Sequence, residues 1–214
     1  MFVPSQYRQP DGAWMVDLLR RNPLALLVTN GVPADGPWAT HLPAILHPQL
    51  SAEWSEDLSG GILLGHMNRA NPHWKALQSE IPAVLVFTGP HAYVSPTLYR
   101  VTPAAPTWNF TSVHVHGVLH KIECAEETLD VVRSTVRVLE AEFGADWDMS
   151  ESIDYIRKLL PAVGAFRFTV SHAEGMFKLS QEQDPEIRKR VRMAFAQHES
   201  TRHREMAELM SRLS

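Results

Sequence analysis

Residues 108–122 have the sequence WNFTSVHVHGVLHKI, in which alternate positions differ in character along the whole stretch. Side chains of a β-strand point alternately to its two faces. The stretch therefore predicts a long strand with Thr111, Val113, Val115 and Leu119 on one face. The other face carries Trp108, Phe110, Ser112, His114, His116, Val118 and His120. Three histidines thus share one face of the predicted strand.

Further strands are predicted on both sides of this one. Aliphatic runs bounded by turn formers lie at residues 24–30, 38–46, 61–67, 83–89 and 163–170. Caps and helical spacing of apolar residues predict helices from Asp11 to before Pro23, at 71–78, at 126–143 and at 150–160. Short strands with inserted helices favour an α+β fold, a closed or half-closed antiparallel β-barrel decorated by helices.

The chain changes character at Asp184, which is placed to cap a helix that begins at Pro185. From there on, basic and acidic residues alternate on helical stretches. We therefore predict two parts: a barrel domain of residues 1–183 and a charged helical appendage of residues 184–214.

Composition excludes several classes of protein. The 214 residues are 44% hydrophobic and carry a formal net charge of −4, which argues against a broad surface for nucleic acid or anionic lipid. The single cysteine, Cys124, cannot form an intrachain disulfide, and the apolar runs are far shorter than a membrane span. The first ten residues lack the pattern of a secretory signal, so we expect a cytoplasmic protein. Glycine-rich nucleotide-binding motifs are absent from the sequence.

The motif GHMNRANPHW (65–74) places His66, Asn68 and Arg69 between an aliphatic strand and a helical turn. A neutral imidazole there can bind a metal, and the guanidinium of Arg69 can hold phosphate or carboxylate. The alternative is that His66 only ends a strand and Arg69 is solvated.

The pair His114 and His116 projects to one side, as a metal site requires. A catalytic zinc site needs a third protein ligand, which His41 or an acidic residue can supply. A polar barrel interior or dimer face is the alternative.

Two further motifs carry polar groups. GMFKLSQEQ (175–183) predicts a glycine-led turn in which Lys178, Ser180 and Gln181 form an anion cradle, or else a solvated loop. In HAYVSPTLYR (91–100), Tyr93 and Tyr99 can donate a proton and Arg100 can bind a carboxylate, although core tyrosines are common.

Several motifs in order resemble the PaiB-like family: HLP (41–43), GHMNRANPHW (65–74), FTGPHAYVSPTLY (87–99), APTWNFTSVHVHG (105–117) and KLSQ (178–181). That family is similar to flavin-binding split β-barrels of the pyridoxamine-phosphate-oxidase type. The resemblance implies a homodimer with its cofactor at the subunit interface. Members of the family include transcriptional regulators.

Within that family, MFVP at the start, GHMNR, FTSVHVHG, GMFKLSQEQ and STRHRE (200–205) resemble the haem-dependent piperazate synthases. These enzymes convert L-δ-N-hydroxyornithine into L-piperazic acid. The regulator-like branch has GHMARAN and KLSQN, whereas this chain has Asn68 and Glu182 at those places. Both positions border the predicted anion-binding motifs, which disfavours a flavin phosphate.

The resemblance implies noncovalent haem b, since no C-x-x-C-H motif occurs, with FMN as the alternative cofactor. It implies His66 as the axial ligand of the iron. The other implied cofactor-binding residues are Asn68, Arg69, His116, Lys178, Ser180 and Gln181. Thr40, Tyr93 and His114 are candidates for proton transfer, and Arg100 and Trp108 for binding the amino-acid substrate. A flavin- or haem-binding transcriptional regulator is the alternative function.

Overall fold

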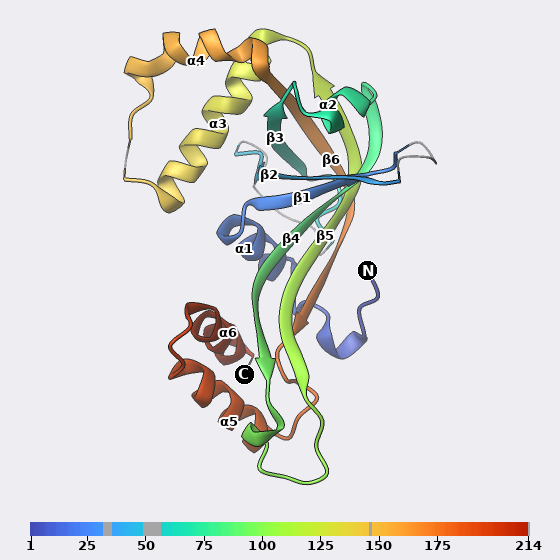
Figure 1. The fold of residues 1–214 in the computed structure, drawn as a ribbon, viewed down its shortest axis with the longest axis vertical. Helices are drawn as coiled ribbons and strands as arrows, with labels where there is room; N and C mark the ends of the chain where they lie inside the picture. Colours follow the sequence, from blue (N-terminus) through green and yellow to red (C-terminus); the bar gives the residue numbers. More distant parts are fainter. Residues whose placement is uncertain (32–35, 49–56, 146, 214) are drawn as a thin grey trace. The chain divides into compact units, whose positions relative to one another are not determined.

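The computed structural model describes residues 1–31, 36–48, 57–145 and 147–213 (Figure 1). The strands are β1 (Leu24–Thr29), β2 (Trp38–Leu46), β3 (Ile62–Asn68), β4 (Glu80–Val94), β5 (Thr107–Ile122) and β6 (Val163–Lys178). The α-helices are α1 (Gly12–Arg21), α2 (Pro72–Ala76), α3 (Ala125–Phe143), α4 (Ile153–Leu159), α5 (Pro185–Ala196) and α6 (Thr201–Arg212). Short 3-10 helices cover Ser5–Tyr7, Pro96–Leu98, Ser150–Ser152 and Leu160–Ala162.

Contacts within the chain define two compact units, and β4, β5 and β6 run through both. We call residues 11–87 and 114–173 the barrel unit. Residues 1–10, 88–113 and 174–214 form the terminal unit, which includes α5 and α6. The predicted division at residues 183 and 184 stays a prediction, because these units are interleaved along the sequence.

The strands form a closed barrel in the order β1-β2-β3-β6-β5-β4. Neighbouring strands are antiparallel; Ala44 of β2 lies opposite Gly65 of β3. The barrel closes where Leu26 of β1 lies opposite Val86 of β4. The predicted antiparallel barrel decorated by helices is therefore confirmed.

Large apolar side chains fill the inside of the barrel. The face of β5 that carries Thr111, Val113, Val115 and Leu119 has no exposed surface at these four residues, as the alternation of that stretch predicted. Leu63 of β3 and both Phe166 and Phe168 of β6 have no exposed surface either. Among the described residues, these side chains make the inside of the barrel a packed core.

Helix α3 covers part of the outer face of the barrel. Val131 of α3 packs against Ile45, Leu64, Ile122 and Ala165, which come from four different strands. Burying one aliphatic side chain contributes roughly 1.5–3 kcal/mol to the stability of the fold. This cluster therefore attaches α3 firmly, and it identifies which residues of each strand point outward.

The predicted helix caps are confirmed. The carboxylate of Asp11 accepts a hydrogen bond from the backbone N–H of Trp14, and Asp184 accepts one from Glu186. In the terminal unit, α5 and α6 pack together (Figure 1). No helix in the described parts of the chain is both long and apolar enough to cross a bilayer.

One local prediction is wrong. Residues 175–178 do not form a glycine-led turn, because β6 continues through Lys178. The turn begins only at Leu179, and Ser180 takes a left-handed conformation with φ 65°. The apolar residues Met176 and Phe177 are both buried, and the packing of this pair favours an extended strand.

His73 of α2 joins the helix to the first two strands of the barrel. Its Nε2 lies 2.8 Å from the hydroxyl of Thr29, and its Nδ1 lies 2.9 Å from the hydroxyl of Thr40. The imidazole is 1% exposed and stacks on Trp38 with ring centroids 5.9 Å apart. Burial lowers the pKa of His73, so the ring is neutral at pH 7 and one nitrogen donates while the other accepts.

Replacing His73 by leucine should destabilise the protein by about 2–4 kcal/mol, because the buried Thr29 hydroxyl loses its partner along with two hydrogen bonds. Urea unfolding followed by circular dichroism measures this loss. His41→Leu on the exposed side of β2 is the matched control and should change stability by about 0.5 kcal/mol or less. Equal losses in the two variants would contradict the bridging role.

Candidate functional site

His66 lies on the outer face of β3. Leu64 packs beneath α3, and His66 is two residues further along the strand, so the two side chains share a face. The ring is half-buried, and its Nδ1 is fully buried with no hydrogen-bond partner among the described residues. Burial lowers the pKa of His66. A neutral imidazole is the form that binds a metal.

The histidines of β5 share this outer face. Ile122 packs in the cluster beneath α3, so His114 and His116, an even number of residues away, project to the same side. His116 stacks on His172 with ring centroids 4.5 Å apart. His120 lies 3.5 Å from the carboxylate of Glu80.

The described residues contain no group of three or more metal-ligating side chains. Within the described residues, the predicted zinc site at His114 and His116 therefore has no third protein ligand. The histidine face remains a polar outer surface of the barrel and not its interior.

Thr40 points to the opposite side of the sheet from His66. Ala44 and Gly65 are cross-strand partners on the inner face, where the ring of Phe166 occupies the space beside Gly65. Thr40 lies four residues before Ala44 and so shares the inner face, where it contacts His73. The structure does not bring Thr40 beside His66.

Asn68 and Arg69 hold the end of β3. The side-chain oxygen of Asn68 accepts a hydrogen bond from the backbone of Ala70 at 2.7 Å. Arg69 donates from Nε to the carbonyl of Val163 at 2.8 Å, and its guanidinium lies 5.8 Å from the ring centroid of Trp74. These contacts connect the end of β3 to the start of β6.

Lys178, Ser180 and Gln181 lie together in the terminal unit. Lys178 donates to the hydroxyl of Thr107 at 2.5 Å. Ser180 is fully buried against Asn109, with their side chains 2.8 Å apart. The side-chain amide of Gln181 accepts a hydrogen bond from the backbone N–H of Leu179 and donates one to the carbonyl of Phe177.

Tyr93, Trp108 and Arg100 also belong to the terminal unit. Tyr93 and Trp108 are each about half exposed, and their ring centroids are 5.9 Å apart. Trp108 also stacks on His91 at 5.9 Å. Arg100 is exposed and has a left-handed φ of 54°. The predicted site residues are thus divided between the two units.

Tyr99 is the second tyrosine of the motif HAYVSPTLYR. It is 3% exposed, and its hydroxyl is buried without a hydrogen-bond partner in the described structure. Burial raises the pKa of Tyr99, and the negative charge of Glu182 raises it further. The motif that contains Tyr99 was noticed, but nothing in the sequence distinguished this tyrosine from an ordinary core residue.

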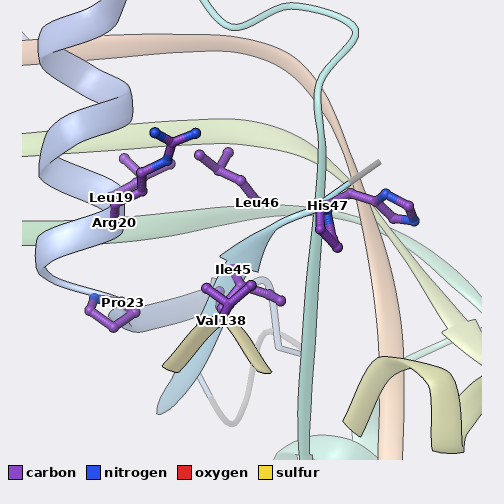
Figure 2. Close-up of a pocket in the computed structure, with 9 residues that line it drawn as sticks. Leu19, Arg20, Pro23, Ile45, Leu46, His47 and Val138 are labelled. Carbon is purple, nitrogen blue, oxygen red and sulfur yellow. The ribbon is translucent and has the colours of Figure 1, made fainter. Parts of the chain in front are cut away.

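The barrel unit also has a mainly apolar pocket of about 230 Å³ (Figure 2). Leu19 and Arg20 of α1, Ile45 of β2 and Val138 of α3 line it, and His47 lies at its edge. Burial lowers the pKa of His47, and the charge of Arg167 lowers it further. None of the predicted site residues lines this pocket.

The motif STRHRE (200–205) folds as the start of α6. His203 stacks on His198 with ring centroids 3.8 Å apart and meets the ring of Phe195 edge-on at 4.9 Å. His198 accepts a hydrogen bond from the backbone of Ser200 at Nδ1, and Arg204 donates to the carbonyl of His198. Burial lowers the pKa of His203, and the neighbouring His198 lowers it further.

Acid should weaken the α5–α6 pair. The folded pKa of His203 lies below the unfolded value near 6.5, so the unfolded state binds more protons below that pH, and stability falls as pH falls. Urea unfolding at pH values between about 7.5 and 5 measures the slope. His203→Leu should flatten it, and identical slopes in the two proteins would contradict this assignment.

Comparisons with known proteins agree with this fold. Residues 1–172 match the family described as "Putative FMN-binding domain". The protease synthase and sporulation protein PAI 2 of Bacillus subtilis is 26% identical over 217 residues, which cover 98% of this chain and 96% of that protein.

Two solved structures resemble the chain at low sequence identity. The FAD and haem binding protein from Mycobacterium smegmatis has a TM-score of 0.58 and 17% identity, covering 86% of this chain and 78% of that one. Flavocytochrome Anf3 from Azotobacter vinelandii has a TM-score of 0.51 and 14% identity, covering 85% and 74%. Three findings agree: the family match, the full-length similarity and the closed antiparallel barrel. They show that the chain belongs to the PaiB-like family of split β-barrel proteins.

Proposed function

We propose that this chain is a haem-dependent piperazate synthase, which closes L-δ-N-hydroxyornithine to L-piperazic acid with loss of water. The observation that carries the proposal is the half-buried His66 on the outer face of β3, which burial keeps neutral. Its sequence context, GHMNR, is among the motifs that resemble the synthases. The family description and the names of the similar structures support a flavin or haem cofactor for this chain.

The properties of His66 fit an axial ligand of haem iron. With haem bound, His66 would be the ligand that the described chain provides to the iron. Burial keeps the ring neutral, so the metal does not compete with a proton at pH 7. Binding is noncovalent in this proposal, because Cys124 is the only cysteine and cannot form the two thioether bonds of a c-type haem.

The cyclisation moves one proton and no net electrons. A bond forms between the α-nitrogen and the side-chain nitrogen, the N–O bond breaks, and the proton lost by the amine leaves in water. Bound haem supplies a Lewis acid that makes the hydroxylamine nitrogen electrophilic. One group that accepts the amine proton and returns it to the departing hydroxide is sufficient.

His114 is our candidate for this proton transfer, because it shares the outer face with His66. Thr40 faces inward and bonds His73, which makes it a weaker candidate. Tyr93, Trp108 and Arg100 belong to the terminal unit, and their roles stay separate predictions: Arg100 to bind a carboxylate and Trp108 to provide a flat apolar surface. Orienting the two nitrogens in a ring-like conformation supplies much of the rate.

A transcriptional regulator that binds flavin or haem is the second candidate. Arg188, Lys189 and Arg192 of α5 line a surface hollow of about 340 Å³ together with the end of α6. A basic hollow of this kind suits the phosphates of DNA. The net charge of −4 argues against extensive contact with nucleic acid, so we place the enzyme first. We also propose a cytoplasmic homodimer.

Protein purified from haem-supplied cells should be red, with an intense Soret band. His66→Ala should remove or shift this band, because the iron loses its axial ligand, and should reduce product formation at least about a hundredfold. Absorption spectra and mass analysis after incubation with δ-N-hydroxyornithine measure both effects. His41→Ala, an exposed histidine of β2, is the matched control and should retain the spectrum.

Three results would contradict the enzyme proposal. An unchanged Soret band in His66→Ala would reject the axial ligand. Haem-loaded protein that forms no product lighter than the substrate by one water would reject the reaction. Yellow protein that binds DNA in a salt-dependent way would favour the regulator.

A further inference from the structure

We infer that the mainly apolar pocket between α1, β2 and α3 binds a small organic anion, a monocarboxylate with an aromatic or branched aliphatic body. All the residues that line this pocket belong to the barrel unit. None of the residues that we assign to the haem site lines it. The ligand of this pocket is therefore additional to the cofactor and the substrate of the proposed function.

Three elements build the apolar walls of the pocket. Leu19 comes from α1, Ile45 and Leu46 come from β2, and Val138 comes from α3 (Figure 2). Leu19 and Ile45 are almost fully buried, and Ile45 also belongs to the cluster that attaches α3 to the barrel. Because packing already holds these walls in place, a ligand does not have to order them when it binds.

Several backbone groups around the pocket are already paired within the protein. The carbonyl of Pro23 accepts hydrogen bonds from the N–H groups of Ala25 and Ala44, at 3.0 and 2.9 Å. The N–H of His47 donates to the carbonyl of Ile62 at 2.9 Å. The walls therefore offer a ligand mainly apolar contact, which favours the burial of an aromatic or aliphatic group.

Arg20 gives the pocket a positive charge. Its guanidinium extends from the last turn of α1 toward the side of the pocket where Leu46 lies (Figure 2). Arg20 is exposed and has no hydrogen bond or ion pair with the described residues, whereas the adjacent Arg21 pairs with Asp17 at 3.1 Å. No carboxylate is among the described side chains that line the pocket. An unpaired guanidinium beside apolar walls suits a carboxylate, which it can bind through two hydrogen bonds.

Arg167 adds a second positive charge on the same outer face of the barrel. It lies opposite Leu64 of β3, and Leu64 lies opposite Ile45 of β2, so the three side chains share a face across neighbouring strands. Arg167 is exposed, as Arg20 is. Positive potential on this face selects an anion over a cation of the same shape.

The volume of the pocket limits the size of the ligand. An apolar cavity of about 150 Å³ holds a benzene molecule. The pocket of about 230 Å³ therefore accommodates a six-membered ring with a short chain. Sites for drug-sized ligands are larger, about 300–1,000 Å³, so this pocket is too small for haem or a flavin. A ring with a carboxylate on a short chain places its apolar body among the walls and its charge at Arg20.

Hydrocinnamate, a phenyl ring with a short carboxylate chain, is the probe for this pocket. Its primary amide keeps the shape and lacks the charge, whereas propanoate keeps the carboxylate and lacks the ring. We expect hydrocinnamate to bind the full-length protein with a dissociation constant of about 1 mM or less. It should bind at least about threefold more tightly than the amide and about tenfold more tightly than propanoate. Heteronuclear NMR titration measures these constants, and the backbone signals of residues 44–47 should shift.

Two substitutions separate the charge from the apolar walls. Arg20→Gln should weaken hydrocinnamate binding about threefold to tenfold and leave the amide unchanged, because only the charged ligand loses a partner. Arg21→Gln is the matched control and should change neither ligand, since Arg21 pairs with Asp17 and does not line the pocket. Val138→Phe places a larger side chain in the pocket and should weaken both ligands at least about tenfold.

Wild-type protein whose signals at residues 44–47 do not respond to hydrocinnamate would overturn the inference. Equal affinities for hydrocinnamate and its amide, or equal losses in Arg20→Gln and Arg21→Gln, would overturn the assignment of an anion. Both arginines are exposed, so these two variants should keep the fold even if Val138→Phe does not. The titration needs neither haem nor product formation, so this inference and the proposed function succeed or fail separately.

Discussion

Closure of the barrel by antiparallel pairing is the constraint on which the rest of the structure depends. Once β1 pairs with β4, every strand has one face inside and one face outside. The inside is filled by Leu63, Leu119, Phe166 and Phe168, which have no exposed surface. The outward direction of His66 and His114 is a consequence of this closure.

Polar side chains that already have hydrogen-bond partners differ from buried polar atoms that have none, and this difference separates structural groups from candidate functional ones. Asn68, Arg69 and Gln181 carry the residue types of an anion site, yet each is bonded to nearby backbone. A buried polar group without a partner costs free energy, so its retention requires an explanation. Within the described structure, His66 Nδ1 and the Tyr99 hydroxyl are such groups. They mark where a ligand or a second protein group has most to contribute.

The family relationship establishes the architecture, while local charge decides what the architecture binds. Related split barrels differ in the cofactor that their names report, FMN, FAD or haem. A flavin phosphate needs free cationic donors, whereas haem needs one neutral imidazole and an apolar surface. In this chain Arg69 and Lys178 each make one side-chain hydrogen bond, and burial lowers the pKa of His66. The neutral imidazole of His66 is the reason that we propose haem chemistry before flavin chemistry.

Local periodicity in the sequence determined most elements, because strand alternation, helix spacing and caps such as Asp11 and Asp184 act over a few residues. The sequence also singled out His66 by its position after an aliphatic strand. Only the tertiary structure decided that Thr40 faces away from His66, that β6 extends through Lys178, and that His73 bridges two strands. These facts depend on strand register and on contacts between residues more than 30 positions apart, which the pattern of neighbouring residues does not encode.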